Sequence, residues 1–541
     1  MNIPKEKFVP VNNREKLHDK KLDTKPISAF QDAMIRFCKN KASIAAFVII
    51  VILVLFSILS PIISPYTVAY NDMYFSYCYP KNKLCVNLGW DFWDGCTEKT
   101  LNEATFIEFS AIGQETGMLA IKDNEYSVEQ TKTGRYYTFR LDSYHLTGCI
   151  TEKMTAAEFK ALQEYQDEHN VQIIYPAVKA LDKALAQKYP QLQQNANLWY
   201  EIEEVYATNA DGTVNKKKKV AVPKVERNED GTIAFDENGN VQFSANYRPY
   251  AGLNSEGEPK DLYTSKMLVE GEERLYNYSV KKQGDQYEVR VNYYEYYIYK
   301  HAMAGDGITE PLFLFGTTQA GKDIFTCLGW GARLSFLLAI SVSAVNMLVG
   351  AIYGAISGYY GGKIDLAMER FAEILGSVPF MIVITLLKMH MGTASQLTIL
   401  FIAFFLTGWI GMAGRVRMQF YRFKNQEYVL AARTLGAKDS RVMLRHIFPN
   451  SLGTIITGSI LSIPGMIFTE SSLSYLGIIN LQTGSMTSVG NLLASAQPYL
   501  TSYPYMMLFP ALFICLLMLS FNLFGNGLRD AFNPSLRGSE D

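Results

Sequence analysis

The sequence predicts an all-α polytopic membrane protein with six transmembrane helices and an α+β domain inserted after the first helix. Long apolar runs lie near the start of the 541-residue chain and in its last third. A polar middle rich in Tyr, Lys, Asp and Glu separates them. The net charge of −1 conceals this division and favours neither acidic nor basic partners.

Residues 1–43 are expected to form a cytoplasmic tail that ends in a helix at the membrane interface. Their first part is lysine-rich and too poorly patterned to fold alone. From residue 27, apolar residues recur at helical spacing with Arg36, Lys39 and Lys41 between them, as in an interfacial helix. By the positive-inside rule these basic residues place the N-terminus in the cytoplasm.

Residues 44–64 form the first predicted transmembrane helix. They supply about the 20 apolar residues needed to cross a bilayer, and Pro61 and Pro65 mark the far end. A cleaved signal peptide is the competing interpretation. The preceding polar region is too long for one, and no small-x-small cleavage site follows, so the helix is expected to be retained.

Residues 65–312 are expected to lie outside the cell and to include helices. Thr155 and Glu158 have the spacing of a capping box, which predicts a helix over residues 155–169. A second helix is predicted over residues 177–188. The basic run at 216–219 has no interleaved aromatic platform and is interpreted as a solvated turn, not as a nucleic-acid site.

The same segment also carries strand and turn signals. Asp-Gly and Asn-Gly pairs stand around short alternating runs in residues 229–243 and predict hairpins. Residues 287–299 form a run typical of a strand. An unstructured tether would lack this richness in tyrosine, so an inserted α+β domain with its own core is expected.

Four cysteines lie in this outer segment, on the side of the membrane where disulfides persist. They are expected to be oxidised, and four cysteines allow three pairings. A bond from Cys78 to Cys85 or to Cys96 is preferred, with Cys149 as the fourth cysteine. No cluster with histidine has metal-ligand spacing, so neither a metal site nor another cofactor is predicted.

Residues 316–322 read Gly-Thr-Thr-Gln-Ala-Gly-Lys and fit the phosphate-binding pattern G-x-x-x-x-G-K. The next residue is Asp323, where such a loop needs the Ser or Thr that holds Mg²⁺. A carboxylate there would repel phosphates, and the segment is expected to lie outside, away from ATP. Nucleotide binding is therefore not predicted.

A helical membrane core is expected over residues 313–527, with a cytoplasmic tail over 528–541. Arginine and lysine are frequent in the loop at 415–452 and absent from 476–504, which places the loop inside and both chain ends in the cytoplasm. Five further membrane helices are predicted over residues 334–353, 366–387, 397–413, 454–475 and 505–524.

Charged residues within these helices have two interpretations. Arg370 and Glu373, beside Glu369, can pair at helical spacing and neutralise a helix end, or take part in transport. Glu470 lies toward the outer end of the fifth helix. A structural hydrogen bond and the lining of a transport path both remain open for it.

The loop at 415–452 is predicted to dock on a cytoplasmic partner. Ala431, Ala432 and Leu435 share a helical face, and small side chains allow close approach. Gly436 permits a sharp turn, and Pro449 is expected to end the helical piece that follows. Two short helices joined at Gly436 are expected.

The spacing of Ala431-Ala432, Gly436 and Pro449 resembles the coupling loop of ABC importer permeases. The fuller string from residue 428 to 450 resembles the oligopeptide and dipeptide permease family. Leu430 stands where many importers have Glu, which leaves Glu427 as the acidic candidate. The resemblance assigns ATPase coupling to Glu427, Tyr428, Ala431, Ala432, Gly436, Arg445, His446 and Pro449.

The resemblance implies the fold of a type I ABC importer permease, as the C-type subunit of a peptide importer in the plasma membrane. It implies a homologous second permease, two cytoplasmic ATPase subunits that hydrolyse ATP, and an extracytoplasmic substrate-binding lipoprotein. The chain itself has no Ser-His-Asp set or Cys-His dyad, so no catalysis is predicted for it, and no nucleic-acid site is predicted either. Peptide substrate and membrane lipid are its other expected partners. An importer of nickel or another small solute, and a membrane-anchored extracellular sensor or adhesion protein, are the alternatives.

Overall fold

The computed structural model describes residues 29–532 with internal gaps. The described residues are 29–131, 134–175, 183–190, 196–197, 200–208, 214–244, 264–269, 272–277, 281–283, 286–483 and 486–532. Residues 1–28 of the N-terminal segment expected over 1–43, and residues 533–541 of the tail expected over 528–541, lie outside them.

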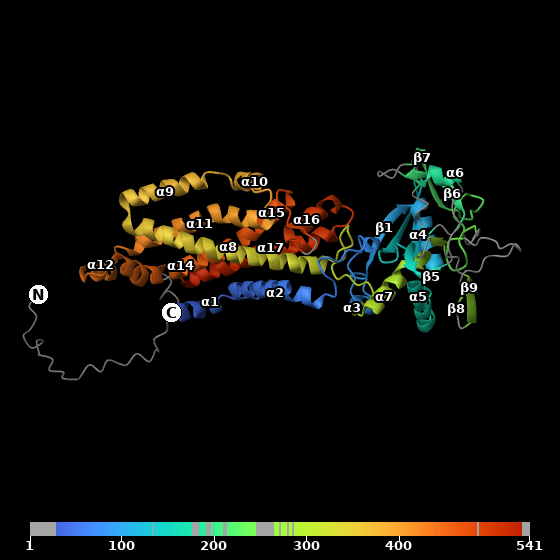
Figure 1. Ribbon diagram of the computed structural model, residues 1–541, viewed down its shortest axis with the longest axis horizontal. Helices are drawn as coiled ribbons and strands as arrows, with labels where there is room; N and C mark the ends of the chain where they lie inside the picture. Colours follow the sequence, from blue (N-terminus) through green and yellow to red (C-terminus); the bar gives the residue numbers. More distant parts are fainter. Residues whose placement is uncertain are drawn as a thin grey trace, which may run out of the picture.

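A bundle of long apolar helices forms one half of the molecule, and the inserted domain forms the other (Figure 1). Among the described residues, five helices are long and apolar enough to cross a membrane. A bent pair, α9 and α10, makes a sixth span if it is counted as one. The five are α2 (Lys41–Ile63), α8 (Ile324–Tyr360), α11 (Gln396–Phe423), the segment Asp439–Tyr475 and α17 (Tyr505–Phe532).

The bent pair differs from the straight helix predicted over residues 366–387. α9 (Gly362–Gly376) and α10 (Phe380–His390) meet at an angle of 72°. Pro379 lies at the break, where its ring disfavours helical backbone in the preceding residue. The apolar composition continues through the break, which is why hydropathy alone predicted one helix.

Helix α8 is longer than the predicted span over residues 334–353. It begins at Ile324 because the Asp323 side chain accepts a hydrogen bond from the Thr326 amide. It ends at Tyr360 with Gly361 in the left-handed region, at φ 68°. At about 1.5 Å per residue, its 37 residues extend roughly 55 Å.

Helices α8 and α11 pack closely through small residues that repeat every four positions. A Cβ atom on Gly354 would lie 2.2 Å from the carbonyl oxygen of Ala413, and one on Gly350 would lie 2.8 Å from that of Trp409. Gly358 approaches Arg417 in the same way. Membrane helices that lack side chains at such positions bring their backbones together. These two helices therefore form a tightly packed pair.

The helix expected before the first span is present as α1 (Ala29–Lys39). Its Ala33 and Phe37 are buried against Leu528 and Ala531 of α17. The Asn40 side chain then accepts from the amides of Ala42 and Ser43 and begins α2.

The inserted domain is α+β, as predicted. One sheet has the strand order β1-β3-β2, and a second has β10-β11-β4 with β5 paired to β11. Two further strand pairs, β6–β7 and β8–β9, complete the described strands. The strands are β1 (Cys96–Asn102), β2 (Ile121–Thr131), β3 (Gly134–Asp142), β4 (Cys149–Thr155), β5 (Ile174–Tyr175), β6 (Ile202–Thr208), β7 (Val214–Pro223), β8 (Thr264–Val269), β9 (Glu272–Asn277), β10 (Lys281–Gln283) and β11 (Gln286–Asn292).

Helices cover these sheets and enclose two cores. Phe106 of α4 packs on Tyr137 and Phe139 of the first sheet. Phe159 of α5 and Tyr297 of α7 pack on the second sheet. The domain thus buries its own apolar side chains, as expected. Its described helices are α3 (Lys83–Asn87), α4 (Glu103–Thr116), α5 (Ala156–His169), α6 (Lys183–Lys188) and α7 (Tyr293–Ala304).

Several local predictions in this domain can be compared with the structure. The capping box is formed, because the side chains of Thr155 and Glu158 each accept from the other's backbone amide. The hairpins over 229–243 are present as antiparallel bridges, with turns at Gly231 and Gly239. Of the helix predicted over residues 177–188, only α6 lies within the described residues.

The strand predicted over residues 287–299 is correct only for its first half. β11 ends at Asn292, whose side chain accepts from the Tyr294 amide and begins α7. Tyr297 of α7 is buried in the core, so tertiary packing overrides the strand preference of this tyrosine-rich run.

Candidate functional site: the α12 surface and the joint

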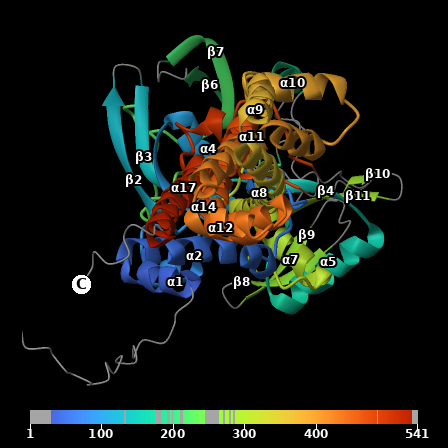
Figure 2. The ribbon, with the colours of Figure 1, turned by 90° about the vertical axis from the view of Figure 1, so that its left-hand side faces the viewer.

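The α12 surface is the exposed end of the bundle farthest from the inserted domain (Figures 1 and 2). It comprises α12 (Glu427–Thr434), the turn at Gly436, and α13 (Asp439–Val442) with the π-helical turn Met443–Ile447. Gly436 has φ 80°, so the two short helices predicted around it are joined by a left-handed residue.

The α12 surface exposes large apolar side chains. Leu435 is 88% exposed and Leu444 is 69% exposed, and Leu430 and Tyr428 are also exposed. Val429, on the opposite face of α12, is fully buried against Val442 and Ile447. An apolar surface of this kind, held in place from beneath, is typical of a protein interaction site.

Hydrogen bonds and ring contacts connect the α12 surface to the end of α8. The Tyr359 hydroxyl of α8 donates to the Asp439 carboxylate over 2.5 Å, and the Arg433 guanidinium lies 4.9 Å from the Tyr359 ring centre. The Asn450 amide donates to the Tyr428 hydroxyl over 3.2 Å. Partial burial raises the pKa of Tyr428, so this hydroxyl stays neutral. Tyr359 therefore connects the end of α8 to both α12 and α13.

A buried carboxylate lies beneath this surface. Asp365 of α9 is 6% exposed and accepts two hydrogen bonds from Arg417 of α11, over 2.6 and 2.7 Å. Tyr421 and Ser357 donate to the same carboxylate, and Arg417 also pairs with Glu369. The cluster joins α8, α9 and α11. No periodic pattern in the sequence indicated this cluster, because Asp365 and Arg417 are 52 residues apart in the chain.

The predicted coupling residues share this surface but differ in exposure. Glu427, Tyr428, Ala431, Gly436 and Arg445 are exposed, whereas Ala432 and His446 are half-buried.

The side chains of Arg370 and Glu373 form an exposed pair over 2.6 Å, which fits local neutralisation of a helix end.

The expected role of Pro449 is wrong. The helical path continues from Asp439 to Tyr475, and Pro449 stands in the first turn of α14 (Phe448–Ile460) instead of ending a helix. Proline is tolerated in a first turn because its missing amide would have no partner there. The π-helical turn immediately before it separates α13 from α14.

Glu470 of α15 (Ser462–Tyr475) is buried between membrane helices at 1% exposure. Its carboxylate accepts from the hydroxyl of Ser335 on α8 over 3.0 Å and from that of Ser474 over 3.1 Å. Ser471 also donates to it over 3.4 Å. The sequence left two roles open for Glu470, a structural hydrogen bond and the lining of a transport path. This geometry fits the structural hydrogen bond.

The expected disulfides are absent from the described residues: Cys78, Cys85, Cys96 and Cys149 are all free thiols. The Cys78 thiol contacts the carbonyl of Ser143, and that of Cys96 contacts the carbonyl of Asp94. Cys149 packs in a different cluster, with Tyr175 and Ala196. The thiols therefore have separate partners.

In the described part of the chain no group of three or more His, Cys, Asp or Glu is arranged to hold a metal.

The phosphate-loop-like sequence forms part of a joint between the bundle and the inserted domain. We define the joint as residues 66–81 against residues 313–323. The Thr317 hydroxyl accepts from the Cys78 amide over 2.8 Å and donates to the carbonyl of Phe75 over 2.6 Å. The backbone of Gly321 has φ 65°, and an added Cβ atom would lie 1.7 Å from the carbonyl oxygen of Asp72. The chain itself thus fills the space that a phosphate would need.

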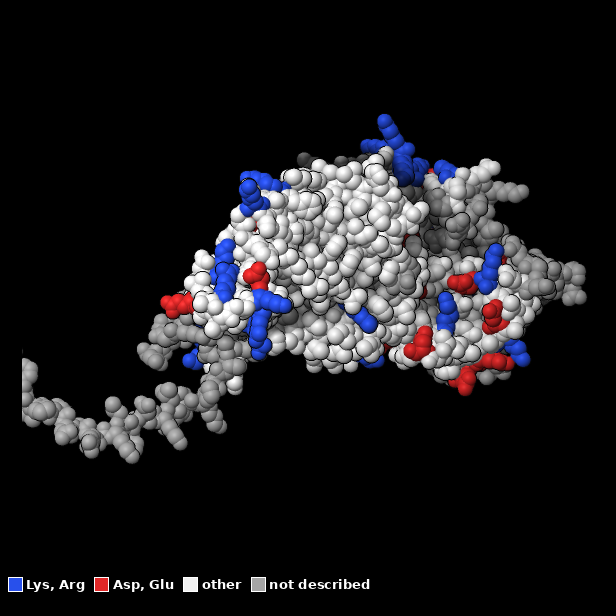
Figure 3. Space-filling model, turned by 60° about the vertical axis from the view of Figure 1, so that its left-hand side comes forward, with Lys and Arg blue, Asp and Glu red and all other residues white. Residues whose placement is uncertain are grey.

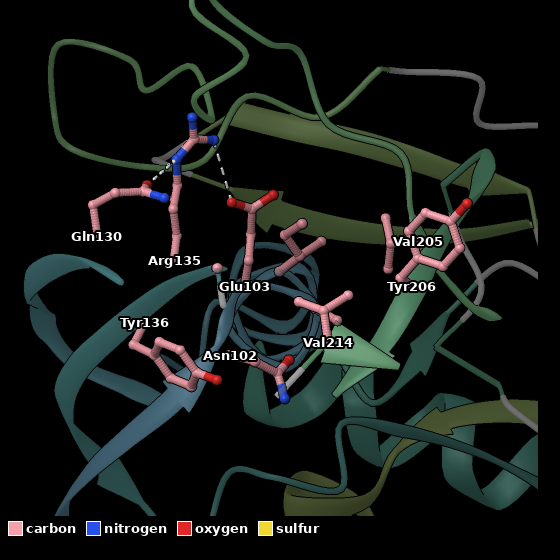
Figure 4. A pocket seen from close by; sticks show the side chains of 11 residues that line it. Asn102, Glu103, Gln130, Arg135, Tyr136, Val205, Tyr206 and Val214 are labelled. Carbon is pink, nitrogen blue, oxygen red and sulfur yellow. Dashed lines mark hydrogen bonds and ion pairs between the residues drawn. The ribbon is translucent and has the colours of Figure 1, made fainter. Parts of the chain in front are cut away.

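The inserted domain also contains an open pocket of about 280 Å³ (Figure 4). Its charged side chains pair with each other: Arg135 lies 3.5 Å from Glu103 and donates to Gln130 over 3.1 Å. The wall opposite is formed by Val205, Tyr206 and Val214. These internal pairs satisfy the polar groups, so nothing in the pocket marks a ligand.

Together, the membrane-length helices and the α12 surface define a polytopic membrane protein with an exposed apolar surface at one end of its bundle. A broad region of the bundle surface is largely free of charged side chains, as expected for contact with lipid (Figure 3). Charged side chains gather instead at the α12 end and on the inserted domain (Figure 3).

Comparison with known proteins identifies the family. Residues 350–538 match the binding-protein-dependent transport system inner membrane component, and residues 28–80 match the N-terminal TM domain of oligopeptide transport permease C. The oligopeptide transport system permease protein OppC of Bacillus subtilis is 44% identical over 223 residues, which are 41% of this chain and 72% of that protein. The chain therefore belongs to the family of binding-protein-dependent transport inner membrane components and is a permease subunit of an ABC transporter.

Two further permease proteins agree with this assignment. The dipeptide transport system permease protein DppC of Bacillus subtilis is 41% identical over 224 residues, or 41% of this chain and 69% of that protein. OppC of Haemophilus influenzae is 40% identical over 228 residues, or 42% of this chain and 72% of that protein. An inward-facing structure of the MetNI methionine ABC transporter aligns at 12% identity, covering 37% of this chain and 94% of that one, with a TM-score of 0.30. Residues 81–349 lie outside both family matches.

Proposed function

We propose that the chain is the C-type permease subunit of an ATP-driven importer of oligopeptides or dipeptides. The observation that carries the proposal is the exposed apolar α12 surface on a chain whose relatives are peptide transport permeases. On this proposal, Leu435 and the small face of Ala431 and Ala432 dock on an ATPase subunit. Glu427, Tyr428, Arg445 and His446 surround that contact.

The transport cycle uses the connection between α12 and α8. Closure of two ATPase subunits moves α12, and the contacts of Tyr359 with Asp439 and Arg433 pass the movement to α8. Because α8 packs closely on α11 and is braced by Asp365 and Arg417, the helices tilt as a body. A homologous second permease supplies the other half of the path, which then opens alternately to each side.

ATP is hydrolysed by the partner subunits, and this chain only couples the movement. The phosphate-loop-like residues 316–322 support this division, because their backbone is engaged in the joint. The membrane is the plasma membrane, with both chain ends and the α12 surface in the cytoplasm. The basic residues around α12 favour that orientation.

The inserted domain, residues 65–312, lies over the outer mouth of the path in this proposal. It meets a substrate-binding lipoprotein there, since the joint holds it directly above the bundle. The core over 313–527 carries the path, and 1–43 and 528–541 are cytoplasmic. A membrane-anchored sensor or adhesion protein would need only one span, so the bundle and the α12 surface disfavour that class.

Uptake by cells that lack the chain tests the substrate class. Cells complemented with the chain and its partner subunits should accumulate a labelled tripeptide, and an excess of unlabelled peptides should compete. Uptake of nickel without peptide uptake would support the alternative small-solute importer and contradict the peptide assignment. Absence of ATP-dependent uptake, with the chain in the membrane, would contradict the importer itself.

A further inference from the structure

The short helix α3 and the loop after it expose a patch of large apolar side chains. We define the α3 patch as Leu84, Leu88, Trp90 and Phe92. Their exposed fractions are 71%, 63%, 50% and 56%. Four exposed side chains of this size within nine residues are a concentration of apolar surface that soluble proteins rarely carry without a function.

The depth of the patch relative to the bundle is fixed by ring stacking. Trp93 stacks on Phe509 of α17, with ring centres 6.2 Å apart and planes at 10°. Phe509 lies four residues inside the end of α17 at Tyr505, which is about 6 Å along the helix axis. Trp93 therefore packs against the second turn of a membrane-length helix, at its domain-side end. In the view of Figure 1, α3 is drawn near the domain-side end of α2.

An unbroken row of aromatic rings leads from the bundle to the patch. Phe315 stacks on Phe509 with ring centres 4.1 Å apart. From Trp93 the row continues to Phe92 at 5.6 Å, and Phe92 stacks on Trp90 at 5.4 Å. The patch is thus continuous with the apolar surface of membrane helices.

The adjoining face of α17 has the exposure expected of a surface in contact with lipid. Leu508 and Leu512, next to Phe509 along α17, are 58% and 49% exposed. These leucines lie in a membrane-length apolar helix and have no water to face there. The α3 patch therefore borders an exposed apolar face of α17.

The loop is held in shape, so it presents these side chains in a fixed arrangement. The Asn82 side chain accepts from the Leu84 amide over 2.9 Å, and the Asn82 amide donates to the carbonyl of Trp93 over 2.8 Å. The Trp90 amide donates to the carbonyl of Cys85 over 3.0 Å. Asp91, the carboxylate within the patch, pairs with Arg140 and Lys122 of the domain.

We propose that the α3 patch inserts into the interfacial region of the leaflet on the inserted domain's side, so that its occupant is membrane lipid. Tryptophan suits this depth, because its ring is apolar and its N–H group reaches polar headgroups. Insertion gives the domain a second attachment besides the joint and fixes its tilt above the bundle. This inference does not depend on which solute the transporter carries.

Spin-label accessibility tests the proposal on the full chain assembled with its partner subunits. Cys38 and Cys515 are exposed and are first replaced by serine. A nitroxide is then attached at Leu88→Cys, in nanodiscs of phosphatidylethanolamine and phosphatidylglycerol. Collision rates with O₂, which concentrates in lipid, and with the water-soluble NiEDDA are compared. Leu512→Cys on α17 provides the lipid control, and Val128→Cys on β2, also exposed, provides the water control.

The expected O₂-to-NiEDDA ratio at position 88 approaches that of Leu512→Cys and exceeds that of Val128→Cys several-fold. A ratio equal to that of Val128→Cys would overturn the proposal, because the patch would then face water. Low collision rates with both reagents would also overturn it, because a protein partner would then cover the patch. Leu84→Cys repeats the measurement if Leu88→Cys does not assemble.

Discussion

Gly321 is the residue on which the joint depends most directly. Its φ of 65° disfavours any side chain, and its missing Cβ leaves room for the carbonyl of Asp72. In the sequence, Gly321 was recognised only as part of a phosphate-loop pattern, and Asp323 was the residue that argued against nucleotide binding. The contact of Gly321 with Asp72, about 250 residues earlier in the chain, could not be predicted from the residues around either position.

Gly321→Ala should therefore loosen the joint, since the new methyl group would collide with the Asp72 backbone. We expect the loss in stability to exceed about 4 kcal/mol, because strain and overlap add. Gly362→Ala is the matched control: Gly362 has φ 54°, but an added Cβ meets nothing within 4 Å. That control should lose only about 1–2 kcal/mol of backbone strain. Equal thermal midpoints for the two variants in detergent would contradict the packing of the joint.

Substitutions at Glu470 test whether this buried carboxylate stabilises the fold or takes part in transport. Glu470→Leu leaves the hydroxyls of Ser335 and Ser474 without their acceptor, so we expect about 1–3 kcal/mol of destabilisation. Glu470→Gln keeps an acceptor of the same shape and should retain both stability and uptake. If Glu470→Gln abolishes uptake at unchanged thermal stability, a role in the transport path replaces the structural one.

At the scale of elements, apolar runs predicted each membrane helix, but not where it begins, bends or ends. The length of α8 follows from the cap at Asp323, and the bend between α9 and α10 from Pro379. The second half of the run over 287–299 became helix because Asn292 caps α7. Caps and prolines are visible in a sequence. Which of them take effect depends on tertiary packing.

The cluster around Asp365 holds α9 on α11, whereas Arg370 and Glu373 form an exposed pair on α9. Arg417→Gln removes the bidentate partner of a buried carboxylate, so we expect about 3–5 kcal/mol of destabilisation and weakened coupling of ATP hydrolysis to uptake. Arg370→Gln is the matched control and should cost less than about 1 kcal/mol. Similar thermal midpoints for both variants would show that the Asp365 cluster does not brace these helices.

At the scale of the whole molecule, composition predicted a membrane bundle with an inserted domain, and the structure agrees. Composition did not predict how the inserted domain is positioned on the bundle. The joint and the stacking of Trp93 on Phe509 set that position, and both connect segments that are distant in the chain. The contacts also show that residues 66–81 pack on the bundle at the base of the domain.

Replacing residues 82–308 with a Gly-Ser linker should leave the bundle intact and keep the hydrogen bonds between residues 66–81 and 313–323. It also removes Tyr144 and Tyr297, which contact Phe75 in the domain core. We expect normal membrane insertion, with loss of uptake and of affinity for the binding protein. Replacing residues 70–308 also removes residues 70–81 of the joint, and should in addition lower the thermal midpoint of the bundle. Full uptake and unchanged affinity after the shorter replacement would reduce the domain to a spacer.

The central claim is that the α12 surface couples this permease to ATPase subunits. The most direct test combines Gly436→Val with Ala432→Glu and measures ATPase co-purification from detergent together with ATP-driven peptide uptake. We expect both to be lost while the chain remains in the membrane, because the turn and the small face of α12 are altered. Gly305→Val, at a left-handed helix end in the inserted domain, is the matched control and should retain both. Unchanged co-purification and uptake in the double variant would contradict the claim.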